Sequence, residues 1–301
     1  MTIINDDTND ETLSRIEAMC RQEDDVTACY NYLQQSHTDI DEKCRTSMVT
    51  WCQQVQKALK LSSETVSIAI SFFDRYLSSG KGKCHEALQD KYKFQLAMIT
   101  SFYISVKLYE SVQLNADTLV KLCKGYYAKA DILDVEEDIL FALDFRLATP
   151  TPMEFVRHFV KLLPSEVNTT SLLKACSKRI EYTTSDFYFT FCKPSVVGAS
   201  CLASILTGRD LLSRTERETF YFQLANICDL IDVMEAQNKL LTGHTKPVSV
   251  SKFTKKSTIV PKKLAGHYVN KAIVANGDSS PVCITQSIAS PVHITQAPRA
   301  A

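Results

Sequence analysis

The chain has 301 residues, of which 45% are hydrophobic and 23% are charged, with 34 basic and 34 acidic side chains. This length suits two ordinary domains or one large one, and the apolar share is enough for a sizeable core. Only eight glycines and nine prolines occur, which argues against a β-sandwich or barrel and favours long helices. The zero net charge argues against a nucleic-acid binder that is held by a diffuse basic field.

The balance of charge hides a gradient along the chain. Residues 1–43 hold 11 acidic and 3 basic side chains, a net charge of −8, whereas residues 244–301 hold 8 basic and 1 acidic, a net charge of +7. The sequence therefore predicts two oppositely charged ends on a nearly neutral body.

The eleven cysteines do not have the pattern of a secreted disulfide scaffold. Their number is odd, no Cys-x-x-Cys pair occurs, and the chain opens with the acidic stretch MTIINDDTNDET instead of an apolar signal segment. The uncharged helical stretches are also shorter than the ~18–20 residues that a membrane span requires. We expect a soluble intracellular protein with reduced thiols, without a membrane partner.

Two helical patterns open the body of the chain, and a third stretch carries no charge. Apolar residues recur at helical spacing from Met48 to Leu59 and again from Val66 to Leu77. A connection rich in Gly and Lys, residues 79–89, follows. Leu96 to Val106 then runs eleven residues without a charge, and a helix that is apolar on every side is expected to lie among other helices.

The same plan returns after a break at residues 148–152, ATPTP. Two amphipathic stretches are followed by Val196 to Leu206, again eleven uncharged residues and 100 positions after the first such stretch. This weak internal duplication predicts an all-α protein with two helical domains, each built around one central helix.

These patterns predict five segments. The end of the chain is rich in proline and small polar residues, and it contains a repeat, SSPVCITQ and ASPVHITQ. The segments are a flexible acidic arm (1–12), an N-terminal helical segment (13–43), two helical domains (44–148 and 149–243) and a disordered basic tail (244–301).

A search for catalytic motifs is negative. The sequence contains no GxxxxGK[ST], GxSxG, HExxH or GxGxxG. Asp6, Asp7 and Asp10 spell DDxxD, a magnesium–diphosphate motif, but they stand in an unpatterned acidic stretch, so we assign them no metal. We expect no catalytic residue, no metal and no cofactor.

Three charged residues stand in apolar surroundings: Lys107 in SVKLYE, Arg45 in CRTSMVTW and Asp74 in FFDRYLSS. The simpler interpretation places them at helix ends facing water, since most lysines and aspartates are exposed. The alternative pairs Arg45 with Asp74 beneath the surface, where the loss of one partner would strand a buried charge. Periodicity alone does not decide between the two.

At these positions the sequence resembles the cyclin family. CRTSMVTW (Cys44 to Trp51) is similar to the opening of the first cyclin-box helix, and SIAISFFDRYLSS (Ser67 to Ser79) to the second-helix signature. SFYISVKLYE resembles the end of the third helix, and Val135 to Val160 resembles the fifth helix and the entry to a second box. The stretch FVRHFVKLLP is most similar to D-type cyclins. The resemblance covers about residues 12–243.

The resemblance implies two tandem five-helix cyclin boxes with an N-terminal helix, in a protein that is not an enzyme. Such a protein binds and activates a cyclin-dependent kinase by pressing on the kinase's regulatory helix. It implies G1/S cell-cycle control, a location in nucleus and cytoplasm, and possible further partners: kinase inhibitors, and substrates with short linear motifs. By this resemblance the kinase-binding residues are Lys107, Leu108, Glu136, Leu140, Phe145 and Leu147.

The family also presents a groove that docks substrate peptides. The matching positions here are Cys44, Ser47, Met48, Trp51 and Gln95. Ser47 stands where the family usually has a branched aliphatic residue, so we expect weaker or altered docking. Arg45 and Asp74 match the family's internal ion pair, which favours the buried alternative. In the tail, Ser280 and Ser290 each precede a proline and are candidate phosphorylation sites.

The sequence has three alternative functions beside kinase activation. A cyclin-box factor that binds DNA would need a more basic body, and its zinc ribbon would need cysteine pairs that are missing here. A cyclin-fold protein in transcription or nutrient signalling is a further alternative. A small helical enzyme is disfavoured because no acid, base or metal set converges.

Overall fold

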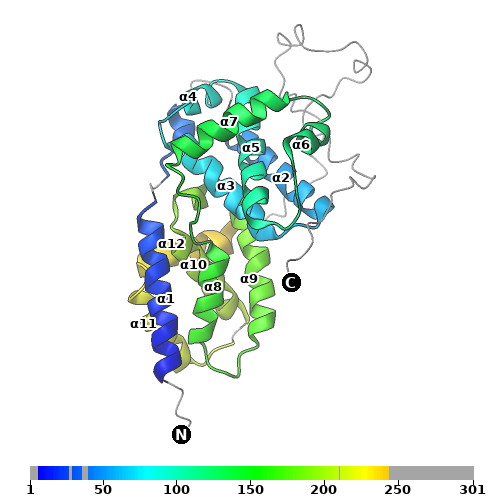
Figure 1. Cartoon of the computed structure of the whole chain (residues 1–301). Coiled ribbons are helices and arrows are strands. Elements are labelled where there is room, and N and C mark those ends of the chain that lie inside the picture. Colours follow the sequence, from blue (N-terminus) through cyan, green and yellow to red (C-terminus); the bar gives the residue numbers. More distant parts are fainter. Residues whose placement is uncertain (1–5, 27–28, 36–39, 210, 244–301) are drawn as a thin grey trace. The chain divides into compact units, whose positions relative to one another are not determined.

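The computed structural model describes residues 6–26, 29–35, 40–209 and 211–243 (Figure 1). These residues are mostly helical and contain no strand. They form two compact units. We call residues 29–145 the α2–α7 unit, and residues 6–26 together with 146–243 the α8–α12 unit. The prediction of an all-α protein with two helical domains is confirmed. The predicted tail, 244–301, with Ser280 and Ser290, lies outside the described residues.

The α2–α7 unit is built around one buried helix. Helix α5 encloses an unbroken buried run from Phe94 to Val106, as its uncharged sequence predicts, because neighbouring helices cover every side of it. Side-chain caps define where helices begin: Asp41 accepts from the Cys44 amide, and Ser62 from the Glu64 amide. The elements are η1 (Tyr32–Gln35), α2 (Glu42–Leu59), α3 (Ser63–Ser78), α4 (Cys84–Ala87), α5 (Lys91–Tyr109), α6 (Ala116–Leu122) and α7 (Lys129–Ala142).

The α8–α12 unit repeats the arrangement around α10. This helix is buried from Ser195 to Leu206, and it packs against α8, α9 and α12. At Gly198 an added Cβ would lie 2.7 Å from the carbonyl oxygen of Pro152, so only glycine allows α8 to approach this closely. The elements are α1 (Asp6–Asp24), α8 (Pro152–Phe159), η2 (Val160–Leu162), α9 (Thr169–Thr183), η3 (Phe187–Phe191), α10 (Pro194–Arg209), α11 (Arg214–Ala225) and α12 (Leu230–Gly243).

The N-terminal region differs from the expectation in two ways. Helix α1 begins at Asp6, so residues 6–12, expected in a flexible arm, are helical; the pair Glu11–Arg15, one turn apart at 3.0 Å, supports this helix. The expected helical segment 13–43 is also divided between the units, because α1 packs on α8 whereas η1 belongs with α2–α7. Ile16 of α1 is fully buried in the core of the α8–α12 unit.

The last turn of α1 is fixed by polar contacts within the same unit. The carboxylate of Glu23 accepts hydrogen bonds from the amide (2.9 Å) and the hydroxyl (2.5 Å) of Ser195 at the beginning of α10. Asp24 pairs with Lys193 at 2.6 Å. Glu23 thereby occupies the place of a cap on α10, where a negative charge is favourable. Burial nevertheless raises the pKa of Glu23.

None of the helices in the described part of the chain has both the length and the apolar character that a membrane crossing needs. The ten cysteines among the described residues are all free thiols. Burial raises the pKa of the Cys176 thiol to about 12 and that of Cys20 to about 11, so these groups behave as small hydrophobic side chains.

Candidate functional site

The candidate site begins with an ion pair between two helices of the α2–α7 unit. Lys107 lies in the last turn of α5 and Glu136 in the middle of α7, and the Lys107 Nζ is 2.6 Å from the Glu136 Oε1. The lysine side chain is 44% exposed and that of the glutamate 12%. The two charged residues that the sequence singled out therefore meet at the surface, with the glutamate more enclosed than the lysine.

The surroundings of Lys107 stabilise its charge. Burial by itself would lower the pKa of Lys107, but the hydrogen bond and the charge of Glu136 outweigh it, and the pKa is raised. The ammonium group also lies 4.9 Å from the centre of the Tyr103 ring, in a cation–π contact. Lys107 is thus a fixed positive charge at the carboxyl end of α5, where the helix dipole favours it.

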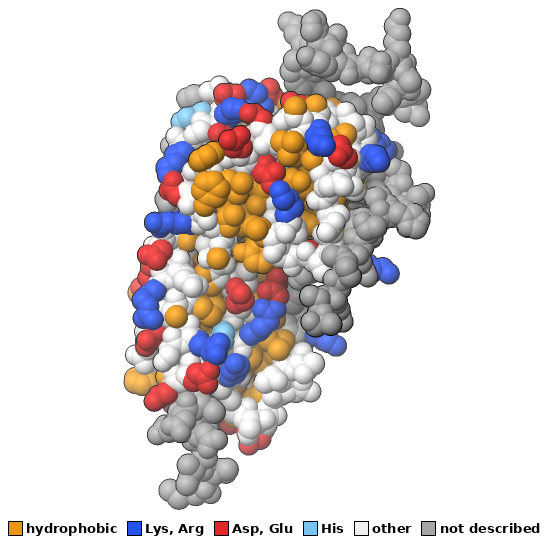
Figure 2. Space-filling view, viewed as in Figure 1, with side chains coloured by type: hydrophobic (Ala, Val, Ile, Leu, Met, Phe, Trp, Pro, Cys, Tyr) orange, Lys and Arg blue, Asp and Glu red, His pale blue; other side chains and the backbone are white. Residues whose placement is uncertain are grey.

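Large apolar side chains are exposed on the same two helices and directly after them. An isolated exposed apolar residue is ordinary, whereas a group of them marks an interaction surface. Figure 2 shows hydrophobic side chains gathered on the face where α7 is drawn in Figure 1. We call this group the α5–α7 patch; its members are Leu108 (50% exposed), Tyr109 (45%), Leu133 (42%), Phe141 (60%) and Phe145 (59%).

The end of the patch has an unusual backbone. After α7, Asp144 and Phe145 both have positive φ, 50° and 55°, a conformation that costs free energy in residues other than glycine. The Phe145 amide donates to the carbonyl of Leu140 at 3.0 Å. The Phe145 ring stands edge-on to that of Phe141, with centroids 5.3 Å apart. Local backbone geometry therefore presents two aromatic rings together at the surface.

The remaining residues that the resemblance assigned to kinase binding lie in different environments. Leu140 is half-buried on α7, beside the exposed members of the patch in the sequence. Leu147 is also half-buried, but it belongs to the α8–α12 unit. The α2–α7 unit by itself thus brings together Lys107, Leu108, Glu136, Leu140 and Phe145, and does not include Leu147.

The positions of the predicted docking groove are largely enclosed. Met48, Trp51 and Gln95 have at most 1% exposure, and Cys44 has 8%, so only Ser47 is partly open. The Gln95 side-chain oxygen accepts from the Tyr127 hydroxyl at 3.1 Å. Two buried donors, Trp51 Nε1 and Gln95 Nε2, have no hydrogen-bond partner among the described residues. Peptide docking here stays a prediction.

Arg45 and Asp74 form a buried ion pair that joins α2 to α3. The guanidinium contacts both carboxylate oxygens, at 2.9 Å and 2.7 Å, and the two side chains are 2% and 5% exposed. The hydroxyl of Tyr32 in η1 donates to the same carboxylate at 2.6 Å. Three elements therefore share one buried charge pair whose hydrogen bonds satisfy it.

Sequence reasoning missed several members of this surface. Phe141 is the most exposed large residue of the patch, and Tyr109 and Leu133 also belong to it. A signal was present for Leu133: at 100° per residue it lies on the same face of α7 as Leu140, turned by about 100° from the buried Ile132 and Ile139. Glu110, the last residue of SVKLYE, accepts from the Ser62 amide at 2.7 Å and the Thr65 hydroxyl at 2.5 Å, which ties the end of α5 to the beginning of α3.

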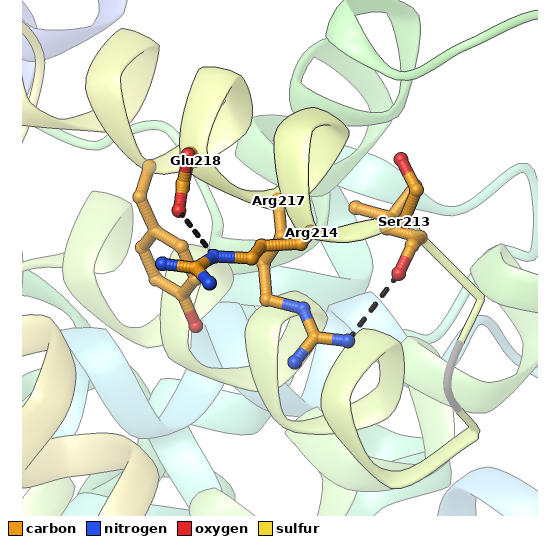
Figure 3. A pocket seen from close by; sticks show the side chains of 6 residues that line it. Ser213, Arg214, Arg217 and Glu218 are labelled. Carbon is orange, nitrogen blue, oxygen red and sulfur yellow. Dashed lines mark hydrogen bonds and ion pairs between the residues drawn. The ribbon is translucent and has the colours of Figure 1, made fainter.

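An open pocket of about 680 Å³ lies elsewhere, at the beginning of α11 (Figure 3). Its arginines are engaged locally: Arg214 pairs with Glu218 at 3.0 Å, and Arg217 donates to the carbonyl of Leu212 at 3.3 Å. Within the described ranges, no three His, Cys, Asp or Glu side chains converge as a metal site. The pocket is an open surface feature with a mixed apolar and polar lining, and its single carboxylate, Glu218, is paired with Arg214.

The sequence matches two family models in tandem. The model for the cyclin N-terminal domain matches residues 14–148, and that for the cyclin C-terminal domain matches residues 150–263. Among solved structures, a viral cyclin from herpesvirus saimiri aligns with a TM-score of 0.61 at 16% identity, over 75% of this chain and 96% of that one. This last likeness concerns the fold.

Curated relatives are A-type and B-type proteins at low identity. Putative cyclin-A3-1 of Arabidopsis thaliana is 30% identical over 57% of this chain and 47% of its own length. G2/mitotic-specific cyclin-B2 of Oryzias latipes is 26% identical over 74% of this chain and 55% of its own. The chain thus spans about half the length of the curated relatives it matches. The D-type subtype expected from FVRHFVKLLP finds no support in these relatives.

Proposed function

Because the chain belongs to the cyclin family, we propose that it is a regulatory subunit that binds and activates a cyclin-dependent Ser/Thr kinase through the α2–α7 unit, and is not itself an enzyme. The observation that carries the proposal is the Lys107–Glu136 pair beside an exposed apolar patch on one face of the unit. An apolar surface with fixed charges at its edge fits a partner helix that buries its own apolar face and pairs its polar groups at the rim.

The aromatic and the charged residues of the site contribute to binding in different ways. Phe141 and Phe145 supply rigid aromatic area, which is where binding free energy usually concentrates. Lys107 offers N–H donors to backbone carbonyls of the partner, and Glu136 offers acceptors to backbone amides. Because Lys107 and Glu136 already hold each other in place in the free chain, little side-chain entropy is lost when the partner binds.

We further propose finer aspects of this role. G1/S control and a D-type character rest on FVRHFVKLLP alone, whereas the relatives have A-type and B-type names. Location in nucleus and cytoplasm, kinase inhibitors as partners and peptide docking beside Ser47 follow from the family resemblance. Action in transcription or nutrient signalling, or as a DNA-binding scaffold, is the alternative that a failure to bind cell-cycle kinases would favour.

The test is co-purification of the full chain with a panel of recombinant cyclin-dependent kinases. The decisive variant carries both Lys107→Glu and Glu136→Lys, which keeps an ion pair within the unit but reverses the charges offered to the partner. The matched control is the double variant Lys93→Glu, Glu86→Lys, which reverses another exposed pair of the same unit. Circular dichroism and melting temperature establish that all three proteins are folded.

We expect the parent and the control to retain a kinase and to raise its activity, and the Lys107/Glu136 variant to retain none. If the parent retains no kinase from the panel, the proposed function is wrong. If both double variants retain the kinase equally well, the chain is a kinase partner whose interface lies elsewhere.

A further inference from the structure

The loop between α3 and α4, residues 79–83 (SGKGK), contacts α7 at two points and the turn directly after α7 at a third. Lys83 pairs with Asp134 at 2.5 Å, and Lys81 pairs with Asp144 at 2.7 Å. Between these two, the Asp138 carboxylate accepts from the amide of Lys83 at 2.9 Å. Each contact joins residues more than 50 positions apart in the sequence, so the loop fastens α7 to a distant part of the same unit.

Asp138 is the central contact, and it also reaches α3. The same carboxylate oxygen that accepts from Lys83 accepts from the hydroxyl of Tyr76 at 2.6 Å. Tyr76 is 1% exposed, so its hydroxyl would lose a partner in a place that water barely reaches if Asp138 were removed. Asp138 thus joins the end of α3, the loop and the middle of α7 through one side chain.

The loop can approach this closely because of Gly82. A Cβ atom at this position would overlap the Asp138 carboxylate, and the residue has a φ of +59°. Gly80 has a φ of +65° as well, so the two glycines give the loop the left-handed turns that bring the Lys83 amide onto the carboxylate. The Gly–Lys–Gly–Lys sequence is therefore a backbone requirement of the contact with α7 as well as a source of charge.

Helix α7 needs such a contact because little of it is buried. Only Ile132, Ile139 and Ala142 of its 14 residues are buried. At 100° per residue, Asp134 and Asp138 lie on one side of this narrow buried stripe. Glu136 and Leu140 lie on the other, where they contribute to the candidate site. Because few of its residues are buried, the polar contacts at the flank of α7 add to the packing that fixes its position.

We propose that Asp138, Gly82 and Tyr76 are positioning residues for the kinase-binding surface: through Asp138 they hold α7, and with it Glu136 and the Phe141–Phe145 pair, in the geometry that the partner meets. This rests on the proposed function. The Lys81–Asp144 pair adds to it at the left-handed turn that directs the Phe145 ring outward. An interface loses affinity when the side chains that contact the partner are not held in position by their neighbours.

The experiment has two measurements on the full chain. The first is hydrogen–deuterium exchange of the free protein, followed in peptides that cover residues 129–145. The second is the dissociation constant for the kinase that the parent retains, at a temperature where every variant is fully folded. A residue that only stabilises the fold leaves this constant unchanged, because the folded population is then complete.

Three variants and one control separate the possibilities. Asp138→Ala removes the acceptor, Tyr76→Phe removes one donor, and Asp138→Ala with Tyr76→Phe tests whether the two act through the same contact. Glu86→Gln breaks an exposed ion pair of α4 and α5 and is the control. Should Asp138→Ala fold poorly, Asp138→Asn keeps the shape of the side chain and replaces the carboxylate.

We expect Asp138→Ala to speed exchange in 129–145 about tenfold and to weaken kinase binding about tenfold, a change of ~1.4 kcal/mol. Tyr76→Phe should have a smaller effect, the double variant should be no worse than Asp138→Ala, and the control should match the parent. If exchange in α7 is unchanged in Asp138→Ala, Asp138 does not hold α7 in position. If exchange is faster but the dissociation constant is unchanged, Asp138 holds α7 but has no role in kinase binding. If the parent retains no kinase, the proposed function fails, while the exchange result still decides whether Asp138 holds α7.

Discussion

Two ion pairs of the α2–α7 unit have the same chemistry but different roles. Arg45 and Asp74 are buried, make two direct contacts with each other and receive a third from Tyr32. Lys107 and Glu136 share one contact, and the lysine is nearly half exposed. The first pair joins helices inside the unit, and the second stands beside the exposed α5–α7 patch.

The difference shows why burial, and not charge, assigns a role to an ionic residue. A buried pair that loses one partner leaves a charge in a medium of low dielectric, which destabilises the fold strongly. A pair whose cation stays in contact with water, as Lys107 does, contributes less to stability. The exposed pair is therefore free to be exchanged for contacts with a partner, whereas the buried pair is not.

The largest expected effect comes from breaking the buried pair. Arg45→Ala should lower the free energy of unfolding by about 3–5 kcal/mol, because Asp74 is left buried without its cation. Chemical denaturation followed by circular dichroism measures this loss. The matched comparison is Lys93→Ala, which removes a cation from an exposed pair of the same unit. A loss below ~1 kcal/mol for Arg45→Ala would mean that water or a neighbouring group compensates Asp74.

A smaller substitution measures how much the Tyr32 hydroxyl stabilises the buried carboxylate of Asp74. Tyr32→Phe removes only the hydroxyl that donates to Asp74, while the ring keeps its buried place in η1. We expect a loss of about 1.5–3 kcal/mol, the range for a hydrogen bond to a charged group. Thermal denaturation of the variant beside the parent gives the value. If Tyr32→Phe proves as costly as Arg45→Ala, the hydroxyl and not the guanidinium is the main support of Asp74.

The exposed pair should give the smallest effect on stability, and one that salt removes. Lys107→Met should lower the free energy of unfolding by about 0–1 kcal/mol at low ionic strength. At ~1 M salt, where the screening length falls to about 3 Å, the difference from the parent should disappear. The loss caused by Arg45→Ala should persist in the same salt. A salt-independent loss for Lys107→Met would show that the contact of the ammonium group with the Tyr103 ring, or the enclosed Glu136 left without its cation, outweighs the screened attraction between the two charges.

Much of the fold could be predicted from local patterns. The uncharged runs at 96–106 and 196–206 became the buried centres of α5 and α10, because a helix without a polar side has no stable place at the surface. Family motifs found Lys107 and Glu136 as well. The same patterns did not predict Phe141, because the sequence does not distinguish an exposed phenylalanine from a core residue until the residues that surround it in space are known.

Sequence alone determined that this chain is helical, has two units, centres each on an apolar helix and carries charges at defined positions of those helices. These are consequences of periodicity and capping, which depend on residues within a turn or two of each other. The family resemblance favoured a buried pair of Arg45 and Asp74, and the tertiary structure confirmed it. Only the tertiary structure decided that α1 packs on the α8–α12 unit and that the Gly–Lys loop reaches Asp138. Those contacts join residues 29 to 172 positions apart. Each residue has many possible partners at such separations, and the packing of whole helices decides which of them it meets.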